Sequence, residues 1–261
     1  MQIYVINLPS ARERNKLQKD QLTKLDLKYK ILNAVSTEDI SKDTYKKHYY
    51  DWQRPLRKTE VACYFSHKSA WNRVIKSKKP ALIIEDDAIL SKALPELLRY
   101  LNNIKNIDLI NLENRSRKKF VSKSYEDIAC QSKLLRLYQD RTGAAGYILW
   151  PSGAKKLIQL EKNKGIGLAD AHITSCYSLK SFQVEPSPIV QLDQCKDYGI
   201  LNSYTKVISK STVSSSQNNR GGFYFIIKRL FFQLKLALRQ LFIFTQSQRR
   251  YISIRNIDFN D

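Results

Sequence analysis

The sequence predicts an α/β fold, in which one domain built on a mostly parallel sheet is followed by a helical tail. Three observations predict it. Short apolar runs of strand length alternate with longer segments of helical composition, an order that favours a parallel sheet. The run at residues 81–84 is wholly apolar, as expected of a central strand covered on both faces. Residues 223–244 form an apolar segment of helix length near the end of the chain.

Each element of the domain has its own local signal. Apolar runs mark the strands, and helical composition bounded by turn residues marks the helices. Thr59 is interpreted as a helix N-cap, and Lys79-Pro80 ends that helix. The expected elements are strands at 2–8, 29–34, 81–84, 107–112 and 143–149, a turn at Pro9-Ser10, and helices at 11–25, 59–79 and 154–162, the last entered through Pro151-Ser152-Gly153.

The chain is expected to divide into three parts. Residues 1–208 form the domain, and residues 209–222, rich in Ser and Asn, form a polar linker. Residues 223–261 form a basic amphipathic helical tail. No uncharged run in the tail reaches the roughly 18 to 20 residues that a bilayer-spanning helix needs. The tail is therefore expected to lie on a membrane instead of crossing it.

Charge is the unusual feature of the composition. The chain holds 45 Lys and Arg against 24 Asp and Glu, a net charge of +21, which calls for an anionic partner. No acidic residue lies between Asp197 and Asp258, while ten Lys and Arg do. Nearly half of the net charge is thus carried by this last segment, and the body holds a milder excess of +11.

The cysteines and the first residues favour a reducing cytoplasm. Cys63, Cys130, Cys176 and Cys195 form no CxxC pair, and the opening MQIYVINLP lacks the features of a signal peptide. The three histidines have no zinc-ligand spacing relative to the cysteines.

Three consecutive acids, Glu85, Asp86 and Asp87, follow the apolar run at 81–84. Ligands of open α/β sheets bind beyond the carboxyl ends of the strands, so these acids are expected at a binding site. Adjacent carboxylates repel one another, and their hard oxygen atoms suit Mg²⁺ or Mn²⁺. The alternative is a solvated acidic turn that leads into the next helix.

The acids belong to a set of motifs that, in type, order and spacing, resembles glycosyltransferase family 25, the family of lipooligosaccharide galactosyltransferases and procollagen galactosyltransferases. The resemblance covers about residues 1–200, and its motifs are specific jointly, not singly. They are IYVINL at 3–8 with Arg12 and Arg14, EVACYFSH at 60–67 with Trp71, ALIIEDDA at 81–88, TGAAGYIL at 142–149 with Gly153-Ala154, LAD at 168–170, and EPSPIVQ at 185–191. Many relatives have Gly where this chain has Thr59.

The resemblance implies a GT-A-like nucleotide-sugar-binding domain and a metal-dependent, inverting hexosyl transfer. The acidic triplet looks like the DXD motif of such enzymes, with Glu85 and Asp87 on Mn²⁺ or Mg²⁺ and Glu85 and Asp86 facing the donor. The implied donor is UDP-galactose, with UDP-glucose or UDP-N-acetylhexosamine as alternatives. The implied acceptor is lipooligosaccharide or lipopolysaccharide core, at the cytoplasmic face of the bacterial inner membrane.

The motifs also supply candidate donor contacts. Asn7 and Arg12, at the end of the first strand and just beyond it, are expected to contact uridine or diphosphate; alternatively they are a turn residue and a surface arginine. Glu60 and His67 lie seven residues apart and share a helix face, so they are expected to line the donor cleft. A structural histidine hydrogen-bonded to glutamate is the alternative.

An inverting transferase needs a base that takes the proton of the acceptor hydroxyl. Asp170 matches the position of the Asp that family members carry after the Gly-rich strand and its helix, and His172 lies two residues on. Both are therefore named as catalytic candidates, with Asp170 preferred. The alternative for Asp170 is a helix N-cap.

The tail is amphipathic on a helical projection. Lys228, Lys235 and Arg239 share a narrow arc opposite Ile226, Leu230, Leu234, Ala237 and Leu241. Such a helix can bind an anionic inner-membrane surface. It can instead pack on the domain or on a second copy of the chain, as in a homodimer. A nucleic-acid-binding protein is a further alternative, but no recognised nucleic-acid motif is present, so no nucleic-acid partner is expected.

Overall fold

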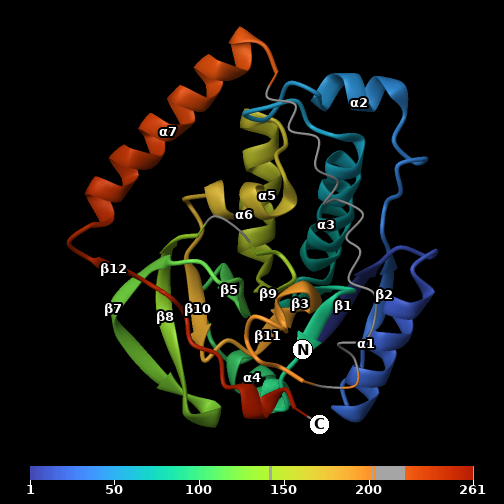
Figure 1. Cartoon of the computed structure of the whole chain (residues 1–261), viewed down its shortest axis with the longest axis vertical. Helices are drawn as coiled ribbons and strands as arrows, with labels where there is room; N and C mark the ends of the chain where they lie inside the picture. The colour runs from blue at the N-terminus through green and yellow to red at the C-terminus, as the bar shows by residue number, and fades with distance from the viewer. Residues whose placement is uncertain (141–142, 202, 204–220, 261) are drawn as a thin grey trace.

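A nine-stranded sheet runs through the molecule, with helices on both of its faces (Figure 1). The structure is a computed structural model that describes residues 1–140, 143–201, 203 and 221–260. The strand order is β12-β7-β8-β10-β5-β9-β3-β1-β2. In chain order the strands are β1 (Gln2–Asn7), β2 (Lys30–Asn33), β3 (Ala81–Glu85), β5 (Leu109–Asn111), β7 (Lys119–Ile128), β8 (Ser132–Gln139), β9 (Gly146–Leu149), β10 (Ser181–Glu185) and β12 (Ser247–Arg250).

The sheet is mixed. The predicted parallel arrangement is found where β1 pairs with β2 and β3, and where β5 pairs with β10. Strand β9 lies antiparallel between β3 and β5, and β7, β8 and β12 add antiparallel pairs. A strand buried on both faces reads the same in either direction, so the apolar pattern of residues 146–149 carries no sign of its orientation.

A second, three-stranded sheet lies beside the first, in the order β4-β11-β6. It consists of β4 (Ala88–Leu90), β11 (Ile189–Gln191) and β6 (Glu113–Asn114). Two residues, Asp86 and Asp87, separate the end of β3 from the start of β4, so the chain passes from the large sheet into the small one through them. The small sheet therefore fixes one side of the acidic turn.

Alternating side chains of the central strands build two cores. Tyr4 and Ile83 face a cluster under helices α3, α5 and α6, whereas Val5 and Leu82 face a cluster under α1 and α4. All four side chains are nearly inaccessible to solvent. This burial on both faces explains the uninterrupted apolar run that the sequence shows at 81–84.

Seven α-helices surround the sheets in the described part of the chain. They are α1 (Arg12–Lys24), α2 (Lys42–His48), α3 (Lys58–Ser77), α4 (Leu94–Leu101), α5 (Pro151–Lys164), α6 (Ala169–Ser175) and α7 (Phe223–Ile243). Helix α5 begins at Pro151, three residues before the predicted start, because proline is favoured in the first turn. The predicted N-cap Thr59 is wrong: Arg57 is the N-cap of α3, and its backbone N–H donates to Glu60.

The end of the chain differs from the predicted helical tail. Helix α7 covers most of the predicted segment, but β12 then joins the edge of the large sheet, antiparallel to β7. Arg250 fixes this strand through two hydrogen bonds to the carboxylate of Glu185, at 2.6 and 2.5 Å. The predicted linker at 209–222 lies outside the described residues up to residue 220. In the described ranges, no helix combines the length and the apolar character that a membrane crossing requires.

Candidate functional site

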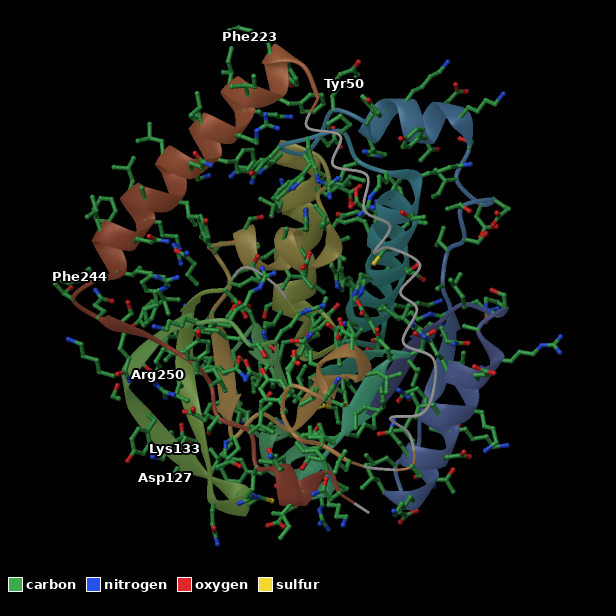
Figure 2. The ribbon with its side chains drawn as sticks, in the orientation of Figure 1. Tyr50, Asp127, Lys133, Phe223, Phe244 and Arg250 are labelled. Carbon is green, nitrogen blue, oxygen red and sulfur yellow. The ribbon has the colours of Figure 1, made fainter. Side chains whose placement is uncertain are left out.

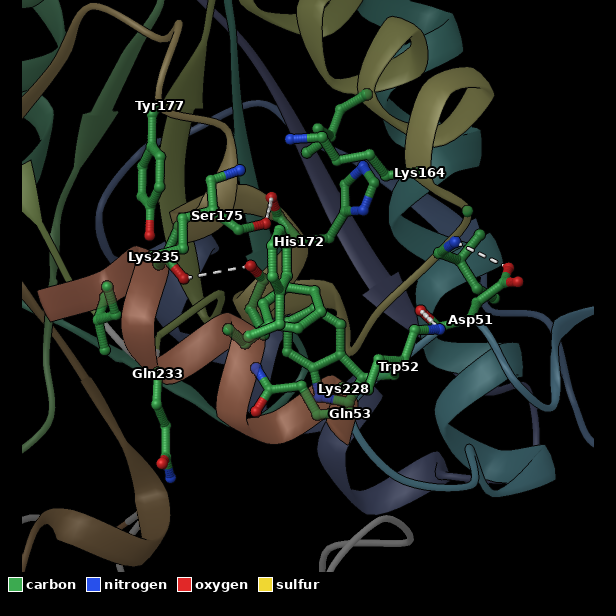
Figure 3. Close-up of a pocket in the computed structure, with 18 of the residues that line it drawn as sticks. Asp51, Trp52, Gln53, Lys164, His172, Ser175, Tyr177, Lys228, Gln233 and Lys235 are labelled. Carbon is green, nitrogen blue, oxygen red and sulfur yellow. Dashed lines mark hydrogen bonds between the residues drawn. The ribbon is translucent and has the colours of Figure 1, made fainter. Parts of the chain in front are cut away.

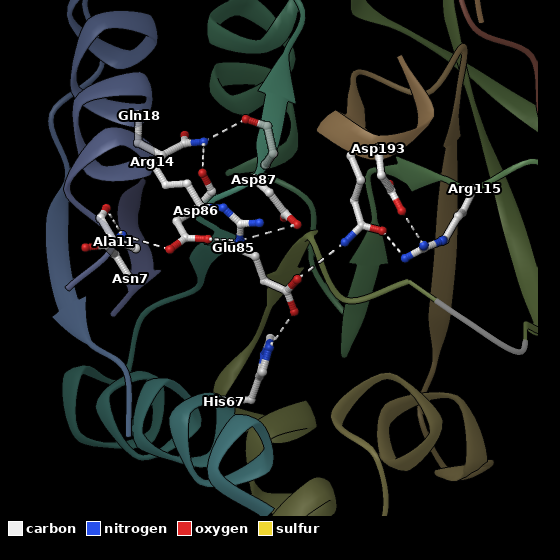
Figure 4. Close-up of polar contacts among 12 residues, drawn as sticks. Asn7, Ala11, Arg14, Gln18, His67, Glu85, Asp86, Asp87, Arg115 and Asp193 are labelled. Atoms are coloured by element: carbon white, nitrogen blue, oxygen red, sulfur yellow. Dashed lines mark hydrogen bonds and ion pairs between the residues drawn. The ribbon is translucent and has the colours of Figure 1, made fainter. Parts of the chain in front are cut away.

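The acidic turn between β3 and β4 lies at the wall of a cavity of about 490 Å³ (Figure 4). Residues from the start of α1, from the segment after β2 and from α3 form the remaining walls. All three acids of the turn line this cavity. The sequence-based expectation that Glu85, Asp86 and Asp87 meet at a strand end is thus met by the fold.

Asp86 is held by side chains from β1 and α1. Asn7 Nδ2 donates to its Oδ2 at 2.8 Å, and Arg14 Nη1 donates to its Oδ1 at 3.0 Å. Gln18 donates to the backbone carbonyls of Asp86 and Ala88, at 3.1 and 2.7 Å. Side chains of helix α1 therefore hold both the carboxylate of Asp86 and the backbone of the turn.

Glu85 is the end of a buried chain of hydrogen bonds. Trp71 Nε1 donates to the Tyr147 hydroxyl at 2.9 Å, which directs the hydroxyl proton towards His67 Nδ1, also at 2.9 Å. His67 Nε2 then carries the ring proton and donates it to Glu85 Oε1 at 2.9 Å. The other oxygen, Glu85 Oε2, has only a long contact of 3.4 Å from Gln191 Nε2.

Asp87 is the least satisfied acid of the turn. Among the described residues its Oδ1 has no hydrogen-bond partner, although it is buried, and its Oδ2 lies 3.9 Å from Arg14 Nη1. Burial and the neighbouring Glu85 carboxylate raise the pKa of Asp87 to about 7. A buried carboxylate with a free oxygen is costly unless a cation approaches it.

A second polar cluster adjoins the acids across the small sheet. Arg115 donates to Gln191 Oε1 and, at 2.7 Å, to Asp193 Oδ2 (Figure 4). Glu113 lies fully buried nearby: its Oε2 accepts from Ala145 N at 2.8 Å, while its Oε1 lacks a partner in the described structure. Burial and the charge of Glu85 raise the pKa of Glu113 to about 8.

Two predicted donor contacts do not reach the cavity. Arg12 is exposed at the start of α1, and Arg14 contacts the acids instead, because residues two apart on a helix point about 200° away from each other. Glu60 is buried and bound by Arg54 and Arg57. Burial opposes its ionisation, but these bonds outweigh that and lower the pKa of Glu60. Glu60 thus has a structural role at the start of α3.

Asn7 and His67 are placed close to the acids, as expected, but in supporting positions. Asn7 is buried beneath Asp86 and is not part of the cavity wall. His67 does line the cavity, and both of its ring nitrogens are already used. The two residues therefore orient carboxylates, and the cavity surface itself is formed by their neighbours.

The two catalytic candidates lie on α6 but point to different surroundings. His172 stacks on Trp71, with ring centroids 5.7 Å apart, and its Nε2 lies 3.1 Å from the Leu157 carbonyl. Burial lowers its pKa, and its side chain lines a different cavity from the one that holds the acids. Asp170 is half-buried, and burial and the charge of Glu85 raise its pKa. It is not the N-cap, which is Leu168.

The cavity offers two sets of groups that could hold a metal ion. Cys63, His67 and Glu85 place ligand-type atoms within 4.8 Å of one another. Burial, however, raises the pKa of the Cys63 thiol well above its usual range. Both ring nitrogens of His67 already form hydrogen bonds, to Tyr147 and to Glu85. The second set is Glu85 Oε2, which has one long contact, and Asp87 Oδ1, which has no partner among the described residues; such hard ligands suit Mg²⁺ or Mn²⁺.

Several residues of this site were not among the sequence-based candidates. Arg14 and Tyr147 belong to the recognised motifs but had no predicted role. Glu113, Arg115 and Asp193 lie outside all of the motifs. The rule that located Glu85 could have located Gln191 as well, since β11 also ends there beside the cavity. No pattern in the sequence indicates that the β6 and β11 ends adjoin β3.

Comparison with known proteins agrees with the resemblance seen in the motifs. The sequence model of glycosyltransferase family 25, described as LPS biosynthesis proteins, matches residues 1–173. That stretch includes the acidic turn, Arg14, His67 and Asp170.

Individual relatives are distant. A putative glycosyltransferase of Haemophilus influenzae is 28% identical over 171 residues, which cover 64% of this chain and 60% of that protein. Procollagen galactosyltransferase 1-A of Xenopus laevis is 26% identical over 61% of this chain and 28% of its own length. The lipooligosaccharide biosynthesis protein lic2B of H. influenzae is 24% identical over 73% of this chain and 76% of its length. The chain thus spans less than two thirds of the length of each of the first two relatives.

Proposed function

The chain belongs to glycosyltransferase family 25, and on that premise we propose that it transfers galactose from UDP-galactose onto the saccharide of a lipooligosaccharide or lipopolysaccharide core. One observation carries the proposal: an acidic turn at a cavity wall, with a buried carboxylate oxygen of Asp87 that no described group satisfies. The large sheet would then serve as a GT-A-like platform for the donor. Names of relatives support the sugar and the acceptor class.

The acids are proposed to hold one divalent cation, Mn²⁺ or Mg²⁺. Asp87 Oδ1 has no partner among the described residues, and Glu85 Oε2 has only the long contact from Gln191, while His67, Asn7 and Arg14 fix the orientation of the other oxygens. When bound, such a cation neutralises negative charge on a departing diphosphate. Arg14, which lines the cavity, would contact the same diphosphate, and the Ser10-Ala11 start of α1 adds the positive end of a helix dipole.

Asp170 is proposed as the base that accepts the proton of the acceptor hydroxyl in an inverting transfer. Its raised pKa brings it nearer to the pH at which a base works well. Changing Asp170→Asn should lower the rate of transfer by about 10²- to 10⁴-fold, the usual contribution of a general base, and leave donor affinity unchanged. Unimpaired transfer by this variant would assign the base elsewhere; Asp127→Ala, an exposed acid on β7, is the matched control.

The direct test of the proposed activity is a panel of UDP-sugars. UDP-galactose, UDP-glucose, UDP-N-acetylglucosamine and UDP-N-acetylgalactosamine are incubated with the chain, with and without Mn²⁺, and released UDP is measured. Slow hydrolysis needs no acceptor, so the identity of the acceptor does not affect the test. We expect Mn²⁺-dependent release from UDP-galactose above the others. Release from none of them, with or without Mn²⁺, contradicts the proposal.

Helix α7 is proposed to bind a membrane surface through its outer face. The residues that face the domain recur at helical spacing and include Lys228, Phe232, Lys235 and Arg239. The outer face is almost wholly apolar, and Figure 2 shows Phe223 and Phe244 at its two ends pointing away from the body. Its exposed large apolar residues are Phe223, Tyr224, Ile226, Ile227, Leu230, Phe231, Leu234, Leu238, Leu241, Phe242 and Phe244.

The three aligned cations of the predicted tail face the body of the molecule, as in the alternative in which the helix packs on the domain: Lys228 donates to the Asp51 carbonyl at 3.2 Å, and Arg239 lies 3.8 Å from the Tyr177 ring centroid. An exposed apolar face of this length marks an interaction surface. An amphipathic helix with such a face lies in the headgroup layer.

Vesicle sedimentation tests the membrane surface. We expect the chain to sediment with vesicles of phosphatidylglycerol and phosphatidylethanolamine, and the double change Leu234→Glu with Leu241→Glu to abolish this. Ile257→Glu, at an apolar residue that is 74% exposed but lies outside α7, is the matched control. If the double variant sediments like the parent chain, α7 is not the membrane-binding element.

A further inference from the structure

A second cavity, of about 640 Å³, lies between α7 and the body of the molecule (Figure 3). Its walls come from α7, from the end of α5, from α6 and from the segment after α2. Glycines shape its floor: a Cβ on Gly165, whose φ is +75°, would lie 2.5 Å from the Asp51 carboxyl carbon, and one on Gly167 would lie 2.8 Å from the Trp52 ring. The segment at 165–167 can therefore approach the cavity wall closely only without side chains.

The charge of this cavity is positive. Lys164 from α5 and Lys228 and Lys235 from α7 line it, together with the acids Asp51 and Asp140. Both acids have partners elsewhere: Asp51 bonds His48 Nδ1 at 2.7 Å and Ile166 N at 2.9 Å, and Asp140 bonds Lys119 at 2.8 Å. The lysines are thus not neutralised by the acids of the cavity wall.

Lys164 and Lys235 are the key pair. Both line the cavity, and Figure 3 shows their side chains extending towards one another; the proximity of Lys164, together with burial, also lowers the pKa of Lys235. No described carboxylate forms an ion pair with either of them. Two adjacent ammonium groups without a counter-charge favour an anion between them, and lysine is a common ligand of phosphate.

The same cavity has aromatic walls suited to a sugar ring. Trp52 and Phe232 lie with ring centroids 5.3 Å apart, and Tyr177 closes the side towards α6. Hydroxyl groups of Thr174 and Ser175 on α6 also line the cavity. A site of this kind offers flat apolar surface and a few polar groups in addition to its positive charge.

Helix α6 separates this cavity from the acidic turn. Ala171, His172 and Ser175 line the lysine cavity, while the preceding Asp170 is close enough to Glu85 for that carboxylate to raise its pKa. A molecule bound in the lysine cavity would therefore lie beside the helix that carries the proposed base.

We propose that the lysine cavity binds the acceptor through a phosphorylated saccharide, with Lys164 and Lys235 on the phosphate and Trp52 with Phe232 against the sugar ring. This inference rests on the proposed function and adds the recognition site for the second substrate. In this arrangement Lys228 and Lys235 of α7 face the charged part of the acceptor. The outer apolar face of the helix faces the bilayer that holds the acceptor's lipid.

Binding of a matched pair of oligosaccharides tests the inference. Core oligosaccharide released by deacylation of lipooligosaccharide is titrated into the full chain before and after chemical removal of its phosphates. Binding is followed by tryptophan fluorescence, because Trp52 is the one of the three tryptophans that lines this cavity. We expect the phosphorylated form to bind about tenfold more tightly, as expected when charge-assisted contacts are gained. Equal affinities for the two forms would overturn the inference.

Variants locate the site. The double change Lys164→Ala with Lys235→Ala should remove the preference for the phosphorylated form, and Lys162→Ala, an exposed lysine of the same helix α5, should keep it. Lys164→Glu serves as a second variant because it leaves α7 untouched and should weaken binding further. Retention of the preference in both variants would overturn the inference.

Two further measurements separate this inference from its alternatives. Mn²⁺-dependent release of UDP should be unchanged in the double variant. If the parent chain itself shows no release, the proposed function fails, and the binding experiment alone then decides whether the cavity holds a phosphorylated saccharide. Vesicles of phosphatidylglycerol are then added to the complex. Displacement of the oligosaccharide by these vesicles from the parent chain would assign the cavity to a lipid headgroup and overturn the saccharide.

Discussion

The acidic cavity and the lysine cavity have opposite charges and are built in different ways. The first is lined by three consecutive acids, which strand ends and a hydrogen-bond network hold in place. The second is lined by three lysines and by aromatic rings, and it exists only because α7 packs across the body. Under the two proposals above, the acidic cavity would recognise its substrate through a cation held by acids, and the lysine cavity would do so through lysines directly.

The two cavities also differ in which groups lack partners. In the acidic cavity the unsatisfied atom is an acceptor, Asp87 Oδ1, and it calls for a metal ion or a donor. In the lysine cavity the unneutralised groups are donors, Lys164 and Lys235, and they call for an anion. Each cavity should therefore be stabilised by its own ligand.

The largest expected effect comes from Asp87→Ala. Removing the free carboxylate oxygen should lower Mn²⁺-dependent UDP release by about 10²- to 10³-fold, comparable to the loss of one transition-state contact. Binding of the phosphorylated oligosaccharide in the other cavity should not change. Thermal unfolding in metal-free buffer should show no loss of stability, because the buried carboxylate is not satisfied in the parent chain. Full release by the variant would place the metal elsewhere.

Arg14→Ala should have the next largest effect. Its loss leaves Asp86 with one fewer donor and removes the positive charge nearest to Asp87, so the KM for the UDP-sugar should rise by about 10- to 100-fold. Arg12→Ala is the matched control on the same helix and should match the parent chain. Equal losses in the two variants would show that general charge, and not the contact with Asp86, determines donor binding.

Tyr147→Phe is expected to affect stability more than catalysis. The change leaves Trp71 Nε1 and His67 Nδ1 without their buried partner, which costs about 1 to 3 kcal/mol per unsatisfied group. Denaturant unfolding measures this cost. UDP release should fall only several-fold, because Glu85 keeps its contact with His67 Nε2. Unchanged stability would contradict the proposed chain of hydrogen bonds.

Glu113→Gln should change how stability depends on pH. Glutamate in the unfolded chain has its ordinary low pKa, whereas burial raises the pKa of Glu113 to about 8 in the folded chain. The parent chain therefore loses stability from this group as pH rises between those values, by at most about 1.4 kcal/mol per pH unit. Gln does not titrate, so the variant should lose less between pH 5 and 8. Parallel curves for the two proteins would show that Glu113 is ionised over this range.

Much of the architecture was predictable from local sequence signals. The apolar run at 81–84, the acids that follow it and the helix-length segment near the end of the chain each indicated their own element, because periodicity and turn residues act over a few residues. The same signals could not give the direction of β9, which depends on packing. They also could not give the pairing of β12 with β7, because these strands lie more than a hundred residues apart in the sequence.

The acidic turn and its family motifs could thus be recognised from the sequence alone, since they are runs of contiguous residues. The tertiary structure decided which arginine reaches the acids, that Glu60 pairs with Arg54 and Arg57, that His172 stacks on Trp71, and that the cations of α7 face inwards. Each of these outcomes depends on the direction of a side chain after distant segments have packed together. A one-dimensional pattern fixes the face of a helix but does not say what will lie against it.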